Sequence, residues 1–208
     1  MKPENISAIR ILERALVVAL CAAAAGCFDE PTPAYKTVPK DARVYLKEMS
    51  LGDLKSQTAA LKADIVEYLN LDRNQLTNVD EVASLAGLKW LRLNDDRLSS
   101  LPDLKALSGL RRIYLRNNKF AAVPEQLKDL PSLTDIDISG NPVKEVPAWL
   151  VEKKGLKNLS FSRTQVTKLP EKLDAWKSLQ SLQLGDLNIS AAEMARIRKA
   201  LPDGAIVF

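Results

Sequence analysis

A chain of 208 residues that is 46% hydrophobic is long enough for one folded domain and a targeting segment. It contains no histidine, which excludes Ser-His-Asp and Cys-His catalysis and makes most zinc sites impossible. Its 30 basic and 26 acidic residues are spread along the chain, unlike the clustered basic stripe of a nucleic-acid-binding protein, so we expect no nucleic-acid partner.

The N-terminal segment has the layout of a signal peptide. Three basic residues among the first 14 precede an uninterrupted apolar run of eleven residues, Ala15 to Ala25. A membrane-spanning helix needs roughly 20 apolar residues, so this run is too short to be a comfortable transmembrane anchor. Glu4 and Glu13 depart from the usual basic leader.

The four residues from Ala24 to Cys27 resemble the bacterial lipobox, in which the chain is cut before a cysteine that becomes lipidated; Ala24 replaces the usual leucine. The resemblance implies a signal peptide over residues 1–26 and a diacyl or triacyl Cys27, which is enough for stable anchoring. Cys21 is a poorer candidate. Simple secretion and a cytosolic chain remain alternatives. Phe28, rather than aspartate, follows Cys27 and favours the outer membrane of the bacterial cell envelope.

Residues 27–42 are predicted to be the lipidated cysteine and an extended tether. Pro31, Pro33 and Pro39 lie among polar residues there, and such a composition favours a semi-rigid spacer. Residues 43–65 follow as an N-terminal cap, with Leu51 to Lys62 at helical spacing as its helix.

Residues 66–190 contain a repeat with the pattern L-x-x-L-x-L-x-x-N-x-L, whose copies are 22 or 23 residues apart. Apolar residues at its fourth and sixth positions share one face of a short strand, so stacked copies form a parallel sheet over a continuous core. The six copies begin at Val66, Leu88, Leu110, Leu133, Leu156 and Leu179.

The ninth position is polar in most copies, and an asparagine there can bond turn backbone groups with both ends of its amide. This column weakens toward the C-terminus, where leucine cannot form hydrogen bonds. Its members are Asn74, Asp96, Asn118, Asn141, Thr164 and Leu187.

These copies resemble leucine-rich repeats. The resemblance implies an α/β fold, a curved right-handed solenoid of about six repeats with a parallel β-sheet on the concave face, short helical or irregular convex segments and terminal caps. Pro-x-x-Leu sequences from Pro124, Pro147 and Pro170 suit short convex helical turns, and Trp149 and Trp176 are expected to pack over the repeat edge.

Residues 191–208 are predicted to be the C-terminal cap. Ser190 is followed three residues later by Glu193, a capping-box signature for a helix that ends near Ala200. Ala205 to Phe208 can then add a last strand to the sheet.

The variable strand positions of the first three repeats predict a contiguous patch on the concave face, because neighbouring strands are about 4.8 Å apart. Tryptophan, tyrosine and arginine are enriched in binding hot spots. The alternative is that the arginines are solvated and stack with gap-filling aromatic residues. The patch residues are Tyr68, Trp90, Arg92, Arg112, Tyr114 and Arg116.

Asp135 and Asp137 lie two residues apart on one strand and invite a paired-carboxylate interpretation. Solvated acids are the simpler interpretation, since a solenoid face offers no enclosed pocket, and both are placed to approach Arg112 and Lys157. The chain has no phosphate-binding glycine loop, metal-ligand cluster or nucleophile elbow.

The sequence therefore predicts a non-enzymatic, monomeric module without cofactor or metal, tethered to the membrane through Cys27. Family analogy implies a protein partner on the concave face, and the arginines favour an acidic one. The alternative is a structural envelope protein that engages peptidoglycan or outer-membrane components, and a hydrolase is a distant third.

Overall fold

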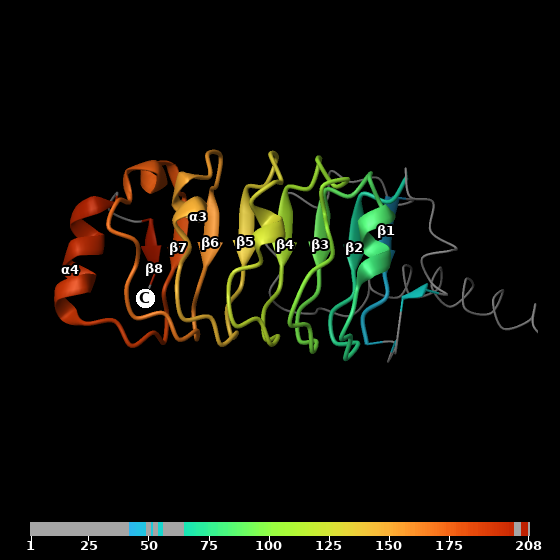
Figure 1. Ribbon diagram of the computed structural model, residues 1–208, viewed down its shortest axis with the longest axis horizontal. Helices are drawn as coiled ribbons and strands as arrows, with labels where there is room; N and C mark the ends of the chain where they lie inside the picture. The colour runs from blue at the N-terminus through green and yellow to red at the C-terminus, as the bar shows by residue number, and fades with distance from the viewer. Residues whose placement is uncertain (1–41, 49–50, 52–53, 56–64, 202–204, 208) are drawn as a thin grey trace, which may run out of the picture.

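The computed structural model describes residues 42–48, 51, 54–55, 65–201 and 205–207, and the predicted signal peptide, tether and most of the predicted N-terminal helix lie outside them. The described residues form one parallel sheet in which each strand pairs with its neighbours in chain order (Figure 1). Its strands are β1 Arg43–Tyr45, β2 Tyr68–Asn70, β3 Trp90–Arg92, β4 Arg112–Tyr114, β5 Asp135–Asp137, β6 Asn158–Ser160, β7 Ser181–Gln183 and β8 Ile206–Val207.

Strands β2 to β7 occupy the third to fifth positions of the six predicted repeats and confirm the repeat phase. The central residue of each strand faces the core and pairs in register with the central residue of the next strand, as Leu91 does with Ile113. The solenoid core consists of these central residues and the leucine column behind them, most of them fully buried. Each such Leu, Ile or Val stabilises the fold by about 1.5–3 kcal/mol, and no single repeat could bury these residues alone.

Strand β1 was not predicted, because residues 43–65 were assigned to a cap alone. Arg43–Tyr45 pairs in parallel with β2, and Leu46 and Leu51 are buried in the same core. This segment is a degenerate repeat that precedes the six predicted copies. It repeats the apolar spacing of Val66, Leu69 and Leu71 only in part, and Met49 occupies the position of the polar ninth residue.

The ninth-position asparagines bond the backbone as predicted. The Asn118 amide donates to the carbonyls of Leu93 at 2.7 Å and Leu115 at 3.0 Å, and its oxygen accepts from the Leu98 N–H at 3.0 Å. Asn141 does the same one repeat later, with Leu115, Ile138 and Phe120. Each amide thus joins two consecutive turns. Thr164 offers only a 3.5 Å contact to the Val166 N–H, which matches the predicted weakening of the column.

The convex segments face away from the sheet (Figure 1). Prolines at positions 124 and 147 directly precede the helical turns η4 and α3, as predicted, whereas the turn after Pro170 starts four residues later. Trp176 is fully buried and Trp149 packs partly against the core, which confirms that both cover the repeat edge. The convex helical turns are η3 Asp80–Ser84, η4 Glu125–Leu127, α3 Ala148–Glu152 and η5 Asp174–Ser178.

The predicted C-terminal helix is present as α4, Ala191–Ala200, and Ser190 caps it by accepting from the Glu193 N–H at 3.2 Å. Glu193 does not complete a capping box. Its carboxylate instead accepts from the Leu169 N–H at 2.9 Å and from Arg196 at 2.7 and 2.8 Å. The Arg196 guanidinium in turn donates to the carbonyls of Leu169 and Pro170, at 3.0 and 3.2 Å. This pair therefore fastens α4 to the fifth repeat.

Replacing Arg196 with alanine is expected to lower the free energy of unfolding by about 1.5–3 kcal/mol, because the buried Glu193 carboxylate loses its charged donor. Hydrogen bonds from Arg196 lower the pKa of Glu193, so this stabilisation is present above the ordinary glutamate pKa and is lost as the pH falls through the lowered one. Urea unfolding at pH 7 and pH 3 measures both effects. Lys199→Ala, an exposed change on the same helix, is the control. A pH dependence that R196A leaves unchanged would contradict this account.

Candidate functional site

Two columns of side chains cross the concave face, because alternate residues of each strand point to the same side of the sheet. All six residues of the predicted patch lie on β2 to β4 or directly after β4, so the structure brings them together. The first column contains Tyr68, Trp90, Arg112, Asp135, Asn158 and Ser181, and the second contains Asn70, Arg92, Tyr114, Asp137, Ser160 and Gln183.

The aromatic residues of the first column stack on one another. Tyr45 on β1 and Tyr68 have ring centroids 5.2 Å apart, and Tyr68 meets the edge of Trp90 at 5.7 Å. The Arg112 guanidinium lies over the Trp90 ring at 4.6 Å. Tyr68 is 2% exposed and Trp90 8% exposed, so these two rings fill space within the fold. This is the stacking alternative that the sequence left open.

The arginines of the patch are paired within the chain. Arg92 binds the Asp72 carboxylate through two nitrogens, at 3.0 and 2.8 Å, and lies 5.6 Å from the Tyr114 ring centroid. Arg112 approaches Asp135 at 3.7 Å and Arg116 approaches Asp95 at 4.0 Å. The arginines are therefore only partly solvated, because each positive charge also has a carboxylate close by.

Asp135 and Asp137 share a face, as predicted, but they are not equally solvated. Asp135 is 7% exposed and accepts hydrogen bonds from Thr134 and from the Asn158 amide, in addition to its approach to Arg112. The Asp137 side chain is half-buried, and its Oδ1 accepts from the Ser139 N–H at 3.0 Å and from the Ser139 hydroxyl at 2.5 Å. The predicted approach to Arg112 is confirmed for Asp135.

A hollow of about 510 Å³ lies over strands β3 to β7 on this face. This hollow is open to solvent and is not an enclosed pocket. The patch residues Arg92, Tyr114 and Arg116 form one side of the hollow, and both aspartates form its middle. Polar residues of the later repeats line the rest, and the sequence did not single them out: Asn158, Ser160, Ser181 and Gln183.

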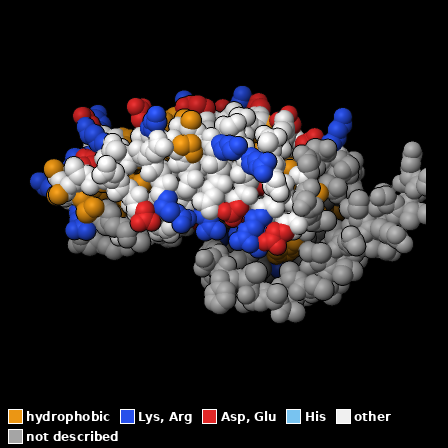
Figure 2. Space-filling view, turned by 90° about the horizontal axis from the view of Figure 1, so that it is seen from below, with side chains coloured by type: hydrophobic (Ala, Val, Ile, Leu, Met, Phe, Trp, Pro, Cys, Tyr) orange, Lys and Arg blue, Asp and Glu red, His pale blue; other side chains and the backbone are white. Residues whose placement is uncertain are grey.

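Charges of both signs alternate on the solenoid surface. Figure 2 shows Lys and Arg side chains next to Asp and Glu side chains on the face seen from below. Along the turn that follows the strands, Arg73 bonds Glu48 at 2.8 Å and lies 3.6 Å from Asp95, which also accepts from the Asn117 amide at 2.6 Å. This row of paired groups joins consecutive turns and leaves little net charge on the rim.

Comparison with known proteins identifies the repeat. Residues 86–143 match the family model described as Leucine rich repeat. Together with the parallel sheet and the buried leucine columns, this match decides the architecture. The fold is a leucine-rich repeat solenoid. Folds of this kind typically serve as interaction scaffolds and not as enzymes, because stacked repeats present an extended concave surface.

Among solved structures, this chain is similar to an LRR protein of Leptospira interrogans, with 23% identity and a TM-score of 0.43. The similarity covers 74% of this chain and 57% of the Leptospira protein, so the chain spans little more than half of that protein's length. No curated protein matches the chain. In the described part of the structure, no helix is long and apolar enough to cross a membrane, and no three potential metal-ligating side chains gather.

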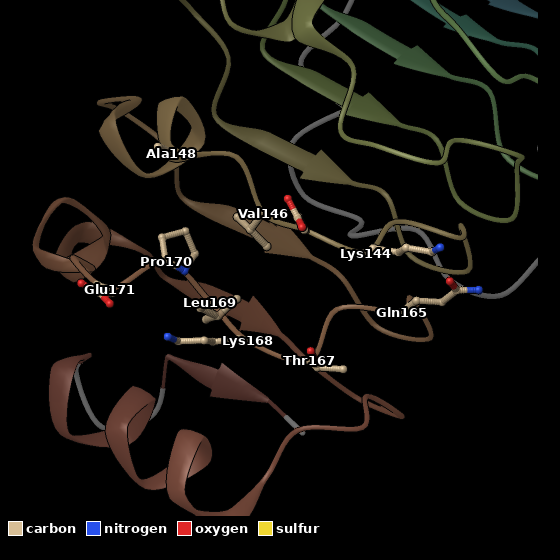
Figure 3. A pocket seen from close by; sticks show the side chains of 10 residues that line it. Lys144, Val146, Ala148, Gln165, Thr167, Lys168, Leu169, Pro170 and Glu171 are labelled. Carbon is tan, nitrogen blue, oxygen red and sulfur yellow. The ribbon is translucent and has the colours of Figure 1, made fainter.

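A second recess lies between the convex segments of the fourth and fifth leucine-rich repeats (Figure 3). It measures about 700 Å³ and is an open groove. Buried Leu169 and Val146 lie at its base, and Lys144, Lys168 and Glu171 surround them. Arg196 and Glu193 bond the backbone of Leu169 at one end of this groove. The groove therefore borders the contact that fastens the C-terminal helix.

Proposed function

We propose that this leucine-rich repeat protein is a protein-binding module held at the bacterial cell envelope, with its partner on the concave face. The observation that carries the proposal is the polar hollow over β3 to β7, which is lined by side chains from five consecutive strands. Stacked repeats create extended concave surfaces that solenoid proteins use for binding, and this hollow is a recessed part of that surface.

Within the predicted patch, the side chains that a partner can reach from solvent are those next to the hollow. The side chains of Arg92, Arg112 and Arg116 are 17%, 21% and 32% exposed, and Tyr114 is half-buried. Tyr68 and Trp90 support this surface from below by stacking. We therefore propose Tyr114 and Arg116 as the main contacts to a partner, with Arg92 and Arg112 beside them.

Capture of partners from detergent-solubilised envelope tests this surface. The double variant Tyr114→Ala, Arg116→Gln is expected to retain at most a tenth of the captured protein, because it removes an aromatic anchor and a charged donor at the hollow. Lys105→Gln is the control, since its side chain is 68% exposed and belongs to a convex segment. Circular dichroism checks that the variants fold.

Unchanged capture by the double variant would reject the concave site. Co-sedimentation with peptidoglycan that is equally insensitive to the double variant would then favour the alternative, a structural envelope protein.

We further propose that the module is anchored by lipid on Cys27, with the outer membrane as its location. The lipobox-like residues Ala24 to Cys27 support this proposal. Cys27→Ser is expected to abolish incorporation of labelled palmitate and to move the protein from the membrane fraction to the soluble fraction, and Cys21→Ser is the matched control. Label that remains in Cys27→Ser and is lost in Cys21→Ser would place the lipid on the other cysteine.

A further inference from the structure

The concave hollow is less positive than its arginines suggest, because Asp135 and Asp137 line it together with Arg92 and Arg116. The guanidiniums of Arg92, Arg112 and Arg116 each have a carboxylate of the same chain within 4.0 Å. Asp137, at the centre of the hollow, has no cationic partner among the residues that the structure describes. Its Oδ1 atom accepts hydrogen bonds from the N–H and the hydroxyl of Ser139. Among the described residues, none donates a hydrogen bond to its Oδ2 atom.

The neighbours of Asp137 suit a cationic group. Tyr114 is its register partner on β4 and Ser160 its register partner on β6, and all three residues line the hollow. A carboxylate and neighbouring hydroxyl groups accept hydrogen bonds from an ammonium or a guanidinium. The Arg92 guanidinium already lies over the Tyr114 ring, so Tyr114 contributes its hydroxyl. Asp135, two residues away on the same face, adds negative potential although it is itself paired.

We propose that the hollow receives a lysine or arginine side chain of the protein partner, with its cationic group on the Asp137 carboxylate between Tyr114 and Ser160. This proposal rests on the proposed protein-binding function and gives the chemistry of the partner. It replaces the acidic partner that the arginines favoured in the sequence. A basic segment fits better because an acidic one would have to compete with Asp72 for Arg92 and share Arg112 and Arg116 with the nearby carboxylates of Asp135 and Asp95.

The first experiment uses the full chain in detergent and short peptides as probes. Acetyl-Gly-Ser-Lys-Ser-Gly-amide and the same peptide with glutamate in place of lysine are titrated at low salt, with backbone NMR shifts as the readout. The lysine peptide is expected to shift the amides of β4 to β6, and the glutamate peptide is not. Binding of the glutamate peptide alone, or of neither peptide, would overturn the proposal.

The second experiment compares two variants that make the same change of charge. Asp137→Asn keeps an oxygen for Ser139 and removes only the negative charge, so it is expected to weaken lysine-peptide binding at least tenfold. Asp186→Asn, at an exposed turn outside the hollow, is the control and is expected to change binding less than twofold. Equal binding by the wild-type chain and D137N would overturn the proposal.

The same two variants separate this inference from the proposed function. Capture of an envelope protein by the wild-type chain and D186N, but not by D137N, supports both proposals. Capture of one protein by all three chains, together with its loss in the Tyr114→Ala, Arg116→Gln variant, would leave the module intact and overturn the basic partner. Failure of every chain to capture a protein would reject the module, and the peptide titrations then decide the Asp137 site alone.

Discussion

Replacing Asn118 with aspartate is expected to lower the free energy of unfolding by about 2–4 kcal/mol at pH 7, since it leaves a buried carboxylate oxygen without a donor. The Asn118 amide nitrogen lies 2.7 Å from the Leu93 carbonyl oxygen and 3.0 Å from that of Leu115. An aspartate oxygen in its place would face two other oxygens in a site that is 7% exposed. Urea unfolding at neutral pH measures the loss.

The opposite substitution can be made at Asp96, because the second repeat already has an aspartate at the ninth position. Its Oδ1 accepts from the Asn74 N–H at 2.8 Å and from the Leu76 N–H at 3.0 Å, whereas Oδ2 is buried with no hydrogen-bond partner. Burial raises the pKa of Asp96 from 3.8 to about 6. Asn74, Asn118 and Asn141 use an amide N–H group at the same place. A protonated Asp96 can donate there and an ionised one cannot.

Asp96→Asn is therefore expected to raise the free energy of unfolding at pH 7.5 by about 1–3 kcal/mol. The pKa of Asp96 is higher in the folded state than in the unfolded state. The protonated carboxyl therefore contributes its full stabilisation below about pH 4, and this contribution is lost as the pH rises through about 6. The two proteins should be nearly equal at pH 4 and diverge by pH 7.5. Parallel stabilities across that range would show that Asp96 is not protonated when folded.

Much of this fold was predictable because one pattern controls it. Apolar residues at the fourth and sixth positions fixed the strands, and the asparagine column fixed the turns between them. Strand β1 was not predicted because its repeat has Met49 instead of a polar ninth residue, although it keeps Val44, Leu46 and Leu51. Its spacing also differs, since Arg43 lies 25 residues before its register partner Tyr68.

The candidate site was less predictable than the fold. Strand positions placed the six patch residues together, but the pairing of Arg92 depends on Asp72, which follows the strand of the preceding repeat. Such an ion pair joins residues of two consecutive repeats, so the sequence pattern of one repeat does not predict it. The contacts among Tyr45, Tyr68 and Trp90 likewise join rings from three strands, β1 to β3. Residue types predicted the patch. Only the partners of each charge showed that Asp137, beside the patch, has no cationic partner in the part of the chain that the structure describes.

The two convex tryptophans, Trp176 and Trp149, are expected to differ strongly in how much each stabilises the fold. Trp176 in η5 is fully buried, and its indole N–H donates to the Leu150 carbonyl of α3 at 3.2 Å. Trp149 in α3 is half-buried, and its indole N–H donates to the exposed Glu125 carboxylate at 2.9 Å. Trp176→Ala is expected to lower the free energy of unfolding by about 3–5 kcal/mol, because it leaves a large cavity and an unpaired buried carbonyl. Trp149→Ala should cost about 1 kcal/mol, as expected for a partly exposed side chain.

The location of the damage tests the argument further, because repeats of a solenoid are stabilised by their nearest neighbours. Trp176 joins the convex segments of the fourth and fifth repeats, and Arg196 fastens α4 to the fifth. Removing Trp176 should therefore speed hydrogen exchange in β6, β7 and α4 while β3 and β4 stay protected. Uniform loss of protection along the solenoid would show instead that the chain unfolds as one cooperative unit, in which the C-terminal repeats have no separate stability.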